Sequence, residues 1–310
     1  MTSDTSEEPH SAQFFNALRD FWWNLDYLQL LGRRLALRDV RAALDVGAGI
    51  GHWGALVLPL LARDATIVAV ERDPRWVERA QARATELGIA ARCRYVTGVA
   101  ESLGFDDESF DLVTCQTLLI HVADVPAVLG EMRRVLRPGG LLLVAEPNNV
   151  ASMLVTDSIR RDEPIEQRLE RVGFAAICER GKAALGEGDN SVGDLLPGYF
   201  AGAGLTDIQT FLNDKTFSLI PPYASAEQAA LKDEMLEDAA HDRWIWPVSV
   251  ARRYYLAGGG DDQAFEARWQ RRLSETHEAV RHLTANQLHT AGGGIEYVVA
   301  GRRPASGRLR

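Results

Sequence analysis

The sequence has few of the residues that define disulfide-rich, zinc-binding or membrane-spanning proteins. Its 310 residues include three cysteines, which are widely spaced and form no CxxC pair, so neither a disulfide framework nor a zinc site is indicated. No apolar run is long enough to cross a bilayer, and the polar, acidic first ten residues are unlike a secretory signal. We therefore expect a cytoplasmic protein without a membrane segment.

Basic residues are in the minority. The chain has 34 lysines and arginines against 43 aspartates and glutamates, which gives a formal net charge of −9. Such a surface repels a nucleic-acid backbone unless basic side chains gather locally. The arginines after Gly301 form a short run that is typical of a solvated chain end, so nucleic acid is not an expected partner.

Three catalytic signatures are also missing. The sequence contains no G-K-[ST] phosphate loop, no G-x-S-x-G nucleophile elbow and no H-E-x-x-H metal motif. These absences argue against a P-loop nucleotidase, an α/β-hydrolase and a zinc protease.

Short apolar runs alternate along the chain with segments whose apolar residues recur every three to four positions, as they do in a helix. A helix is expected to begin at Asp73 and Pro74, a favourable N-cap followed by proline at the first helical position. Strands with helices between them imply right-handed crossovers and therefore an α/β fold with a doubly wound, mostly parallel sheet. The predicted strands are Ala42 to Val46, Thr66 to Glu71, Arg92 to Val96, Phe110 to Gln116 and Gly140 to Glu146.

The alternation breaks after Glu146, and this break suggests how the chain is organised. Residues 150–190 and 214–290 are largely of helical character, and we predict that they form a helical substrate lid over the carboxyl edge of the sheet, where ligands of such folds bind. The predicted α/β core comprises residues 41–149, 191–213 and 291–304.

The segment before the core is rich in aromatic residues. Apolar side chains between Ala12 and Leu37 recur every three to four positions, which predicts one continuous helix. Residues 1–40 would then form an N-terminal helical cap.

The stretch LDVGAGIGHWG raises the question of what its glycines bind. Gly47, Gly49 and Gly51 alternate, and His52 stands where the third glycine of G-x-G-x-x-G would be, so a pyrophosphate-binding turn is disfavoured. Asp45 would also repel a phosphate. Glu71, at the end of the second strand, can accept hydrogen bonds from both hydroxyls of a ribose, and an acidic wall suits a positively charged sulfonium.

Six motifs carry a resemblance to a known family. They are LDVGAGIG, VAVERDP, FDLVTCQTLLIHV, EMRRVLRPGGLLLVAEPN, GYFAGAGLTDIQ and IEYVVAGRRP. Their order and spacing resemble those of class I S-adenosylmethionine-dependent methyltransferases. The resemblance implies a seven-stranded Rossmann-like sheet with an antiparallel last strand, S-adenosyl-L-methionine as cofactor, and methyl transfer. It covers residues 40–147, 194–212 and 293–304, so the helical insertions lie outside it.

The resemblance assigns roles by position. Gly47, Ala48 and Gly49 would approach the methionine part of the cofactor. Glu71 would hold the ribose, and Arg72 would flank the adenine. The further cofactor-binding candidates are Trp23, Tyr27, Asp45, Trp53, Val99, Ala100, Glu101, Gln116 and Thr117.

One position departs from the family pattern. Val99 stands where the family usually places an acidic residue that binds the adenine amino group. Ala100 and Glu101 would then complete an apolar adenine slot, with Glu101 in place of the missing carboxylate. The departure leaves room for a relative that has kept the fold but changed or lost methyl transfer.

Two residues are candidates for catalysis. His121 follows the fourth strand and would act as a general base if the nucleophile carries a proton. Glu146, at the end of the fifth strand, would accept a proton or orient a substrate amine. Each also has a purely structural interpretation, as a residue that packs at a strand end. Trp23 and Tyr27 also have two interpretations: they contact the ligand, or they pack in the apolar core without touching it.

The leading hypothesis is a methyltransferase that acts on oxygen, nitrogen or carbon of a small molecule. The alternative is a methyltransferase-fold protein repurposed for non-methylating chemistry, such as a cyclisation, or for binding. A nicotinamide-dependent reductase is disfavoured by His52 and Asp45. No metal is expected, and the sequence leaves a homodimer open.

Overall fold

The computed structural model describes residues 17–305 of the chain, and these form two compact units. The unit that we call the sheet unit comprises residues 23–154, 179–214 and 294–305. The helical unit comprises residues 17–22, 155–178 and 215–293. None of the described helices is long and apolar enough to cross a membrane.

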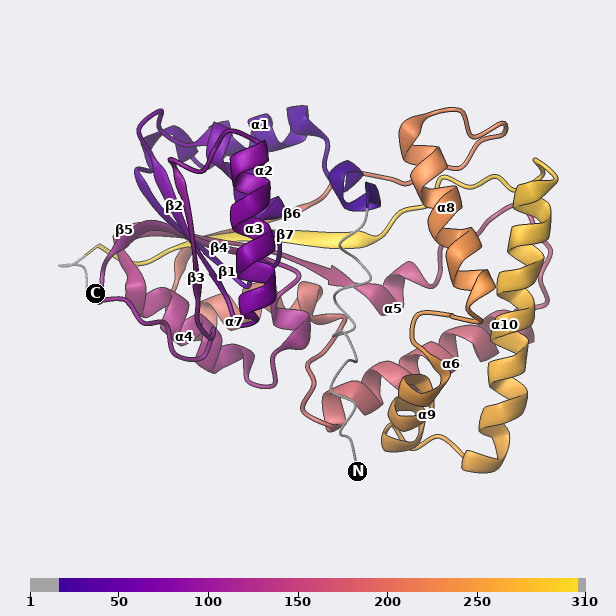
Figure 1. Ribbon diagram of the computed structural model, residues 1–310. Helices are drawn as coiled ribbons and strands as arrows, with labels where there is room; N and C mark the ends of the chain where they lie inside the picture. The colour runs from indigo at the N-terminus through magenta and orange to yellow at the C-terminus, as the bar shows by residue number, and fades with distance from the viewer. Residues whose placement is uncertain (1–16, 306–310) are drawn as a thin grey trace, which may run out of the picture. The chain divides into compact units, whose positions relative to one another are not determined.

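The sheet unit contains seven strands in the order β3-β2-β1-β4-β5-β7-β6. The strands β1 to β5 run parallel, and β7 is antiparallel to both β5 and β6. This arrangement confirms the predicted doubly wound, mostly parallel sheet (Figure 1). The strands are β1 Ala42–Val46, β2 Thr66–Glu71, β3 Cys93–Thr97, β4 Phe110–Gln116, β5 Leu136–Asn148, β6 Thr206–Leu212 and β7 Ile295–Arg302.

The order of the strands creates a switch point between β1 and β4. The chain leaves β1 toward β2 on one side and later places β4 on the other side. In open α/β sheets, ligands bind at the carboxyl ends of the strands beside such a switch. The loops after β1, β2 and β4 are therefore the first place to look for a site.

Capped helices connect the strands. Helix α3 (Pro74–Glu86) begins at Asp73, whose side chain accepts a hydrogen bond from the backbone N–H of Arg75, as predicted. Helix α4 (Val125–Val135) is capped in the same way by Asp124. Such caps satisfy backbone donors that have no partner within the helix. The remaining helices of this unit are α1 Leu25–Arg34, α2 His52–Val57, α5 Asn149–Ser152 and α7 Leu196–Gly202, with 3-10 turns η3 Leu37–Asp39, η4 Leu58–Leu60, η5 Leu119–His121 and η6 Val192–Leu195.

Both faces of the sheet are covered. Helix α3 buries Trp76, Ala80 and Ala84 and contacts β2 and β3. Helices α4 and α7 contact each other and lie together beneath the sheet in Figure 1. Their buried side chains, such as Met132 and Phe200, join the apolar core of the strands. This packing holds the carboxyl ends of the strands in fixed positions.

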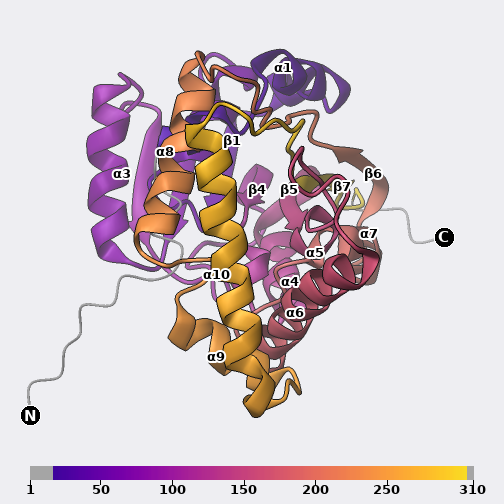
Figure 2. The same ribbon diagram turned by 90° about the vertical axis from the view of Figure 1, so that its right-hand side faces the viewer.

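The helical unit has a core of its own, and it is aromatic. Six aromatic side chains pack in its centre: Phe174, Trp246, Tyr254, Tyr255, Phe265 and Trp269. Helices α8 and α10 run side by side within this unit (Figures 1 and 2). The unit contains η2 Ala17–Phe21, the first part of α6 Ile165–Ala184, α8 Ala226–Ala240, α9 Val248–Ala257 and α10 Asp262–Thr284.

The prediction of one continuous helix from Ala12 to Leu37 is wrong over its described part, and residues 12–16 lie outside the described residues. The turn η2 ends at Phe21, and α1 begins only at Leu25. Asn24 between them is extended, with φ −79° and ψ 126°, and its side-chain amide donates to Asp214 at 3.0 Å. Asparagine favours helix ends because its side chain competes for such hydrogen bonds.

Candidate cofactor and active site

The glycine turn after β1 takes a path that side chains would obstruct. Gly47, Gly49 and Gly51 all have positive φ, at 69°, 53° and 80°, a region that glycine enters without steric cost. A Cβ on Gly47 would lie 2.6 Å from a methyl group of Leu118, and one on Gly51 would lie 2.3 Å from the Tyr95 hydroxyl. The backbone N–H groups of Gly47 and Ala48 donate to the carbonyl of Val70 at 2.8 and 3.0 Å. The turn is therefore fixed to β2.

Glu71 connects this turn to the end of β2. Its Oε2 accepts the N–H of Gly49 at 2.9 Å, and its Oε1 accepts the N–H of Asp73 at 3.1 Å. A carboxylate has about four acceptor positions, so this half-buried side chain keeps acceptor capacity for two further donors. Arg72, the next residue, is exposed. The arrangement suits a ligand with two neighbouring hydroxyls.

The loop after β3 lies beside Glu71. The N–H of Gly98 donates to the backbone carbonyl of Glu71 at 3.0 Å. Val99 follows and leaves 46% of its surface exposed, whereas Ala100 is buried and Glu101 is exposed. An exposed aliphatic side chain in this place offers an apolar surface to a flat ring.

Three of the predicted cofactor contacts form an aromatic cluster. The ring of Trp23 lies 5.0 Å from that of Trp53 and 6.2 Å from that of Tyr27. The Trp53 indole donates to the Thr114 hydroxyl at 2.7 Å. The Trp23 Nε1 and the Tyr27 hydroxyl are buried and have no hydrogen-bond partner among the described residues. Burial raises the pKa of Tyr27 to about 12, and the carboxylates of Asp214 and Glu296 contribute to this.

The other predicted residues lie near the same strand ends. Asp45 is almost fully buried in β1 and has an oxygen 3.1 Å from where a Cβ of Gly54 would be. Gln116, also buried, ends β4. Thr117 follows it with φ 50°, which is unusual for a β-branched residue. Its N–H donates to the carbonyl of Ala145 at 2.9 Å. Such local strain is often found at functional sites.

His121 and Glu146 are linked through the turn η5. His121 is exposed and ends this turn. Glu146 has no exposed surface, and its Oε1 accepts the N–H groups of Leu118 and Leu119 at 2.8 and 2.7 Å. Its Oε2 accepts the N–H of Ile120 at 3.4 Å. Burial raises the pKa of Glu146 to about 8, against the lowering effect of these donors.

A buried lysine holds the same turn from the other side. Lys182, on α6, is nearly inaccessible and donates from Nζ to the carbonyl of Ile120 at 2.5 Å and also to the side chain of Asn190. Burial lowers the pKa of Lys182 to about 8 and raises that of its neighbour Glu179 to about 7. A Cβ on Gly188 would lie 2.3 Å from the same Ile120 oxygen. The carboxyl group of Glu146 and the amino group of Lys182 therefore fix the backbone of the turn that ends at His121.

Residues 44–144 match the family model described as a methyltransferase domain. This segment contains the glycine turn, Glu71 and the turn η5, and it lies entirely in the sheet unit. The similarity of this segment to class I S-adenosylmethionine-dependent methyltransferases therefore covers about a third of the chain.

Curated relatives match a little less than half of the chain. The uncharacterized methyltransferase YcgJ of Bacillus subtilis is 33% identical over 144 residues, which cover 46% of this chain and 55% of YcgJ. The sterol 24-C-methyltransferase erg6 of Aspergillus fumigatus is 30% identical over 144 residues, which cover 46% and 36% of the two chains. The match therefore spans about half of these relatives' length or less.

Solved structures show the fold. That of Bacillus subtilis YcgJ has a TM-score of 0.51 and 20% identity, and the match covers 91% of this chain and all of YcgJ. A Bacillus halodurans protein has a TM-score of 0.52 and 18% identity, with 91% and 99% covered. The Rossmann-like class of the fold is thereby confirmed.

Two features of the candidate site were not predicted. Lys182 lies in the insertion, where no motif marks it, and its burial results from tertiary packing. The hydrogen bonds of Glu146 to η5 likewise depend on how β4 and β5 pair. Within residues 17–305, no group of three or more histidine, cysteine, aspartate or glutamate side chains could hold a metal ion.

Proposed function

We propose that the sheet unit binds S-adenosyl-L-methionine at the glycine turn and that the protein methylates oxygen, nitrogen or carbon of a small molecule. The observation that carries this proposal is the position of Glu71. Its carboxylate is fixed by Gly49 and Asp73 and keeps acceptor capacity for a ribose diol.

The chemistry of the site fits this cofactor. When bound, S-adenosylmethionine supplies a methyl group on a positively charged sulfur. Asp45 and Glu71 make the surroundings of the turn acidic, which favours a cation and disfavours a pyrophosphate. Val99 would lie against the adenine, and Gly47 to Gly49 would leave room for the methionine part.

The aromatic cluster supports the proposal independently. The Trp23 Nε1 and the Tyr27 hydroxyl are buried donors without a hydrogen-bond partner among the described residues, and unsatisfied buried donors cost free energy. We infer that the bound cofactor or substrate supplies their acceptors. The ring of Trp23 is then also available for a cation–π contact with a sulfonium.

His121 is proposed as the general base. Methyl transfer is a direct displacement, so alignment of the nucleophile supplies much of the rate, and a base contributes when the nucleophile must lose a proton. His121 is exposed at the end of η5. Glu146 is buried and bound to the backbone of η5, and we therefore propose that it positions His121 without touching the substrate.

The alternative is a repurposed methyltransferase fold, and Val99 is the observation that favours it. Incubation with methyl-deuterated S-adenosylmethionine and a small-molecule extract separates the two functions. We expect mass spectrometry to find a product that carries the deuterated methyl group. Binding of the cofactor without any labelled product would support the alternative.

The role of His121 can be tested in the same assay. With His121→Ala we expect the rate of label transfer to fall about 100-fold or more, because general-base catalysis contributes about 10² to 10⁴, while the KM for S-adenosylmethionine stays unchanged. The matched control is His241→Ala, which replaces an exposed histidine of the helical unit and should leave the rate unchanged. An unchanged rate for His121→Ala would show that His121 is not the general base and has a structural role only.

A further inference from the structure

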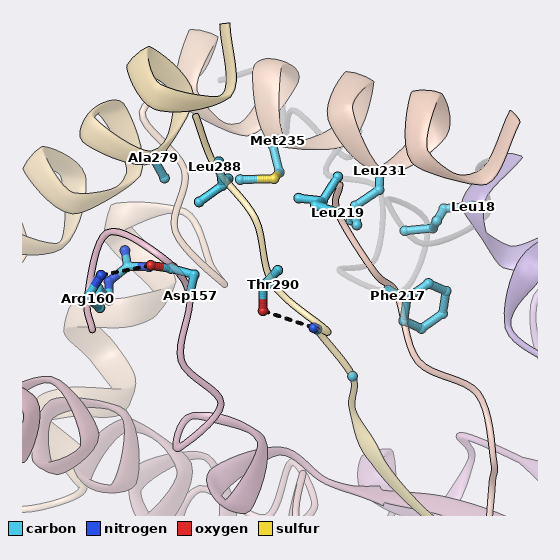
Figure 3. Close-up of a pocket in the computed structure, with 12 residues that line it drawn as sticks. Leu18, Asp157, Arg160, Phe217, Leu219, Leu231, Met235, Ala279, Leu288 and Thr290 are labelled. Carbon is cyan, nitrogen blue, oxygen red and sulfur yellow. Dashed lines mark hydrogen bonds and ion pairs between the residues drawn. The ribbon is translucent and has the colours of Figure 1, made fainter. Parts of the chain in front are cut away.

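An open cavity of about 320 Å³ lies in the helical unit, and none of the residues proposed above to bind the cofactor or catalyse methyl transfer lines it. Its wall is mainly apolar. Leu18, Leu219 and Leu288 are buried yet line it, and Leu231 and Met235 of α8 join them. Figure 3 shows these side chains gathered along one side of the cavity.

The backbone segments around the cavity are bound to one another. The N–H and carbonyl of Leu219 pair with those of Thr290 at 3.0 and 3.1 Å, and the N–H of Ser158 donates to the carbonyl of His289 at 2.9 Å. The Thr290 hydroxyl donates to the carbonyl of Thr156 and accepts the N–H of Gly292, both at 2.9 Å. Because these polar groups are already paired, the wall is preformed and offers mostly apolar surface.

One ion pair lines the cavity beside this apolar wall. Asp157 accepts hydrogen bonds from the N–H groups of Ile159 and Arg160 at 2.9 Å and pairs with the Arg160 guanidinium. A guanidinium has five N–H donors. Within residues 17–305, the Arg160 guanidinium makes a single hydrogen bond, and its acceptor is Asp157. Arg160 can therefore donate to a ligand. Because Asp157 balances the positive charge of Arg160, an anionic ligand gains little electrostatic attraction from this arginine.

We propose that this cavity is a binding site for a neutral, mainly apolar small molecule that carries one oxygen able to accept a hydrogen bond from Arg160. The volume sets the size of this ligand. A cavity of about 150 Å³ holds one benzene ring, so this cavity accommodates two fused rings or an aliphatic body of roughly ten to twelve non-hydrogen atoms.

Equilibrium dialysis of the full-length protein against 2-naphthol tests the proposal without S-adenosylmethionine, so its outcome is independent of methyl transfer. We expect binding at a single site with a Kd on the order of 100 µM, typical of a ligand of this size. Naphthalene-2-sulfonate, which has the same rings and a negative charge, should bind at least tenfold more weakly. No uptake of 2-naphthol, or equal uptake of the sulfonate, would overturn the proposal.

Variants locate the site. Ala279→Phe on α10 fills the cavity and should abolish the uptake of 2-naphthol, whereas Ala267→Phe, at an exposed position of the same helix, should not change it. Met235→Trp fills the cavity from the partly exposed α8 side and serves if Ala279→Phe does not fold. Retained uptake in a folded filling variant would contradict the assignment.

Arg160→Met tests the polar contact. This variant should lower the affinity for 2-naphthol by about tenfold, the order expected for one hydrogen bond to a charged group. It should leave the affinity for naphthalene, which has no oxygen, unchanged. Equal losses for both compounds would show that Arg160 acts only on the shape of the cavity.

Discussion

Replacing Glu71 with alanine is expected to weaken the binding of S-adenosylhomocysteine, the demethylated cofactor, by at least about 100-fold. Each hydrogen bond to a charged group contributes about 1.5 to 3 kcal/mol, and the variant loses two that Glu71 would make to the ribose. It also releases the N–H groups of Gly49 and Asp73, so the glycine turn loses its connection to the end of β2. Isothermal titration calorimetry measures the change directly.

Two controls separate binding from folding. Glu78→Ala removes an exposed carboxylate from α3 and should bind S-adenosylhomocysteine as tightly as the unaltered protein. Glu71→Gln keeps the shape of the side chain and one carbonyl oxygen. Its affinity for S-adenosylhomocysteine should therefore lie between those of Glu71→Ala and the unaltered protein. An unaltered affinity of folded Glu71→Ala would show that the ribose does not lie on this residue.

Replacing Glu146 with alanine is expected to lower the free energy of unfolding by about 3 kcal/mol or more. The substitution leaves the backbone N–H groups of Leu118, Leu119 and Ile120 without the acceptor they now share, and each buried unsatisfied donor costs about 1 to 3 kcal/mol. Urea denaturation measures the loss. A change of less than about 1 kcal/mol would mean that η5 does not depend on this carboxylate.

Glu146→Gln provides a test of the charge on this residue. Burial raises the pKa of Glu146 to about 8 in the folded state, from 4.5, so the folded protein holds this proton more tightly than the unfolded chain. The resulting stabilisation is complete below about pH 4.5 and is lost as the pH rises through about 8, with a slope of at most about 1.4 kcal/mol per pH unit. Glutamine does not titrate.

The unaltered protein should therefore lose stability relative to Glu146→Gln as the pH is raised from 5 to 9. Urea denaturation of both proteins across this range measures the difference, and all other titrating groups are shared. Parallel stability curves would show that the pKa of Glu146 is not raised by folding.

Local patterns in the sequence were sufficient to predict the centre of the sheet. The bounds of β1, β2 and β4 agree with the prediction, because buried parallel strands are short, nearly continuous apolar runs. The helix break at Asn24 was missed. The apolar period of the aromatic segment continues across it, whereas the hydrogen bond from Asn24 to Asp214 joins residues far apart in the chain.

The sequence likewise predicts one part of the candidate site and not the other. The glycine turn and Glu71 follow from spacing along neighbouring strands, so sequence alone could predict that they meet. The buried contacts of Lys182 and Glu146 with η5 depend on chain segments more than 20 residues away. Neither an apolar period nor a short motif predicts contacts over such separations in the sequence. The folded structure shows that η5, the turn that ends at His121, is held from two sides.

A crystal structure of the protein with S-adenosylhomocysteine tests the central claim most directly. We expect both ribose hydroxyls to donate to the Glu71 carboxylate, the adenine ring to lie against Val99, and the homocysteine part to follow the backbone of Gly47 to Gly49. A complex in which the Glu71 side chain points away from the ligand, or in which the ligand occupies another part of the chain, would contradict the account.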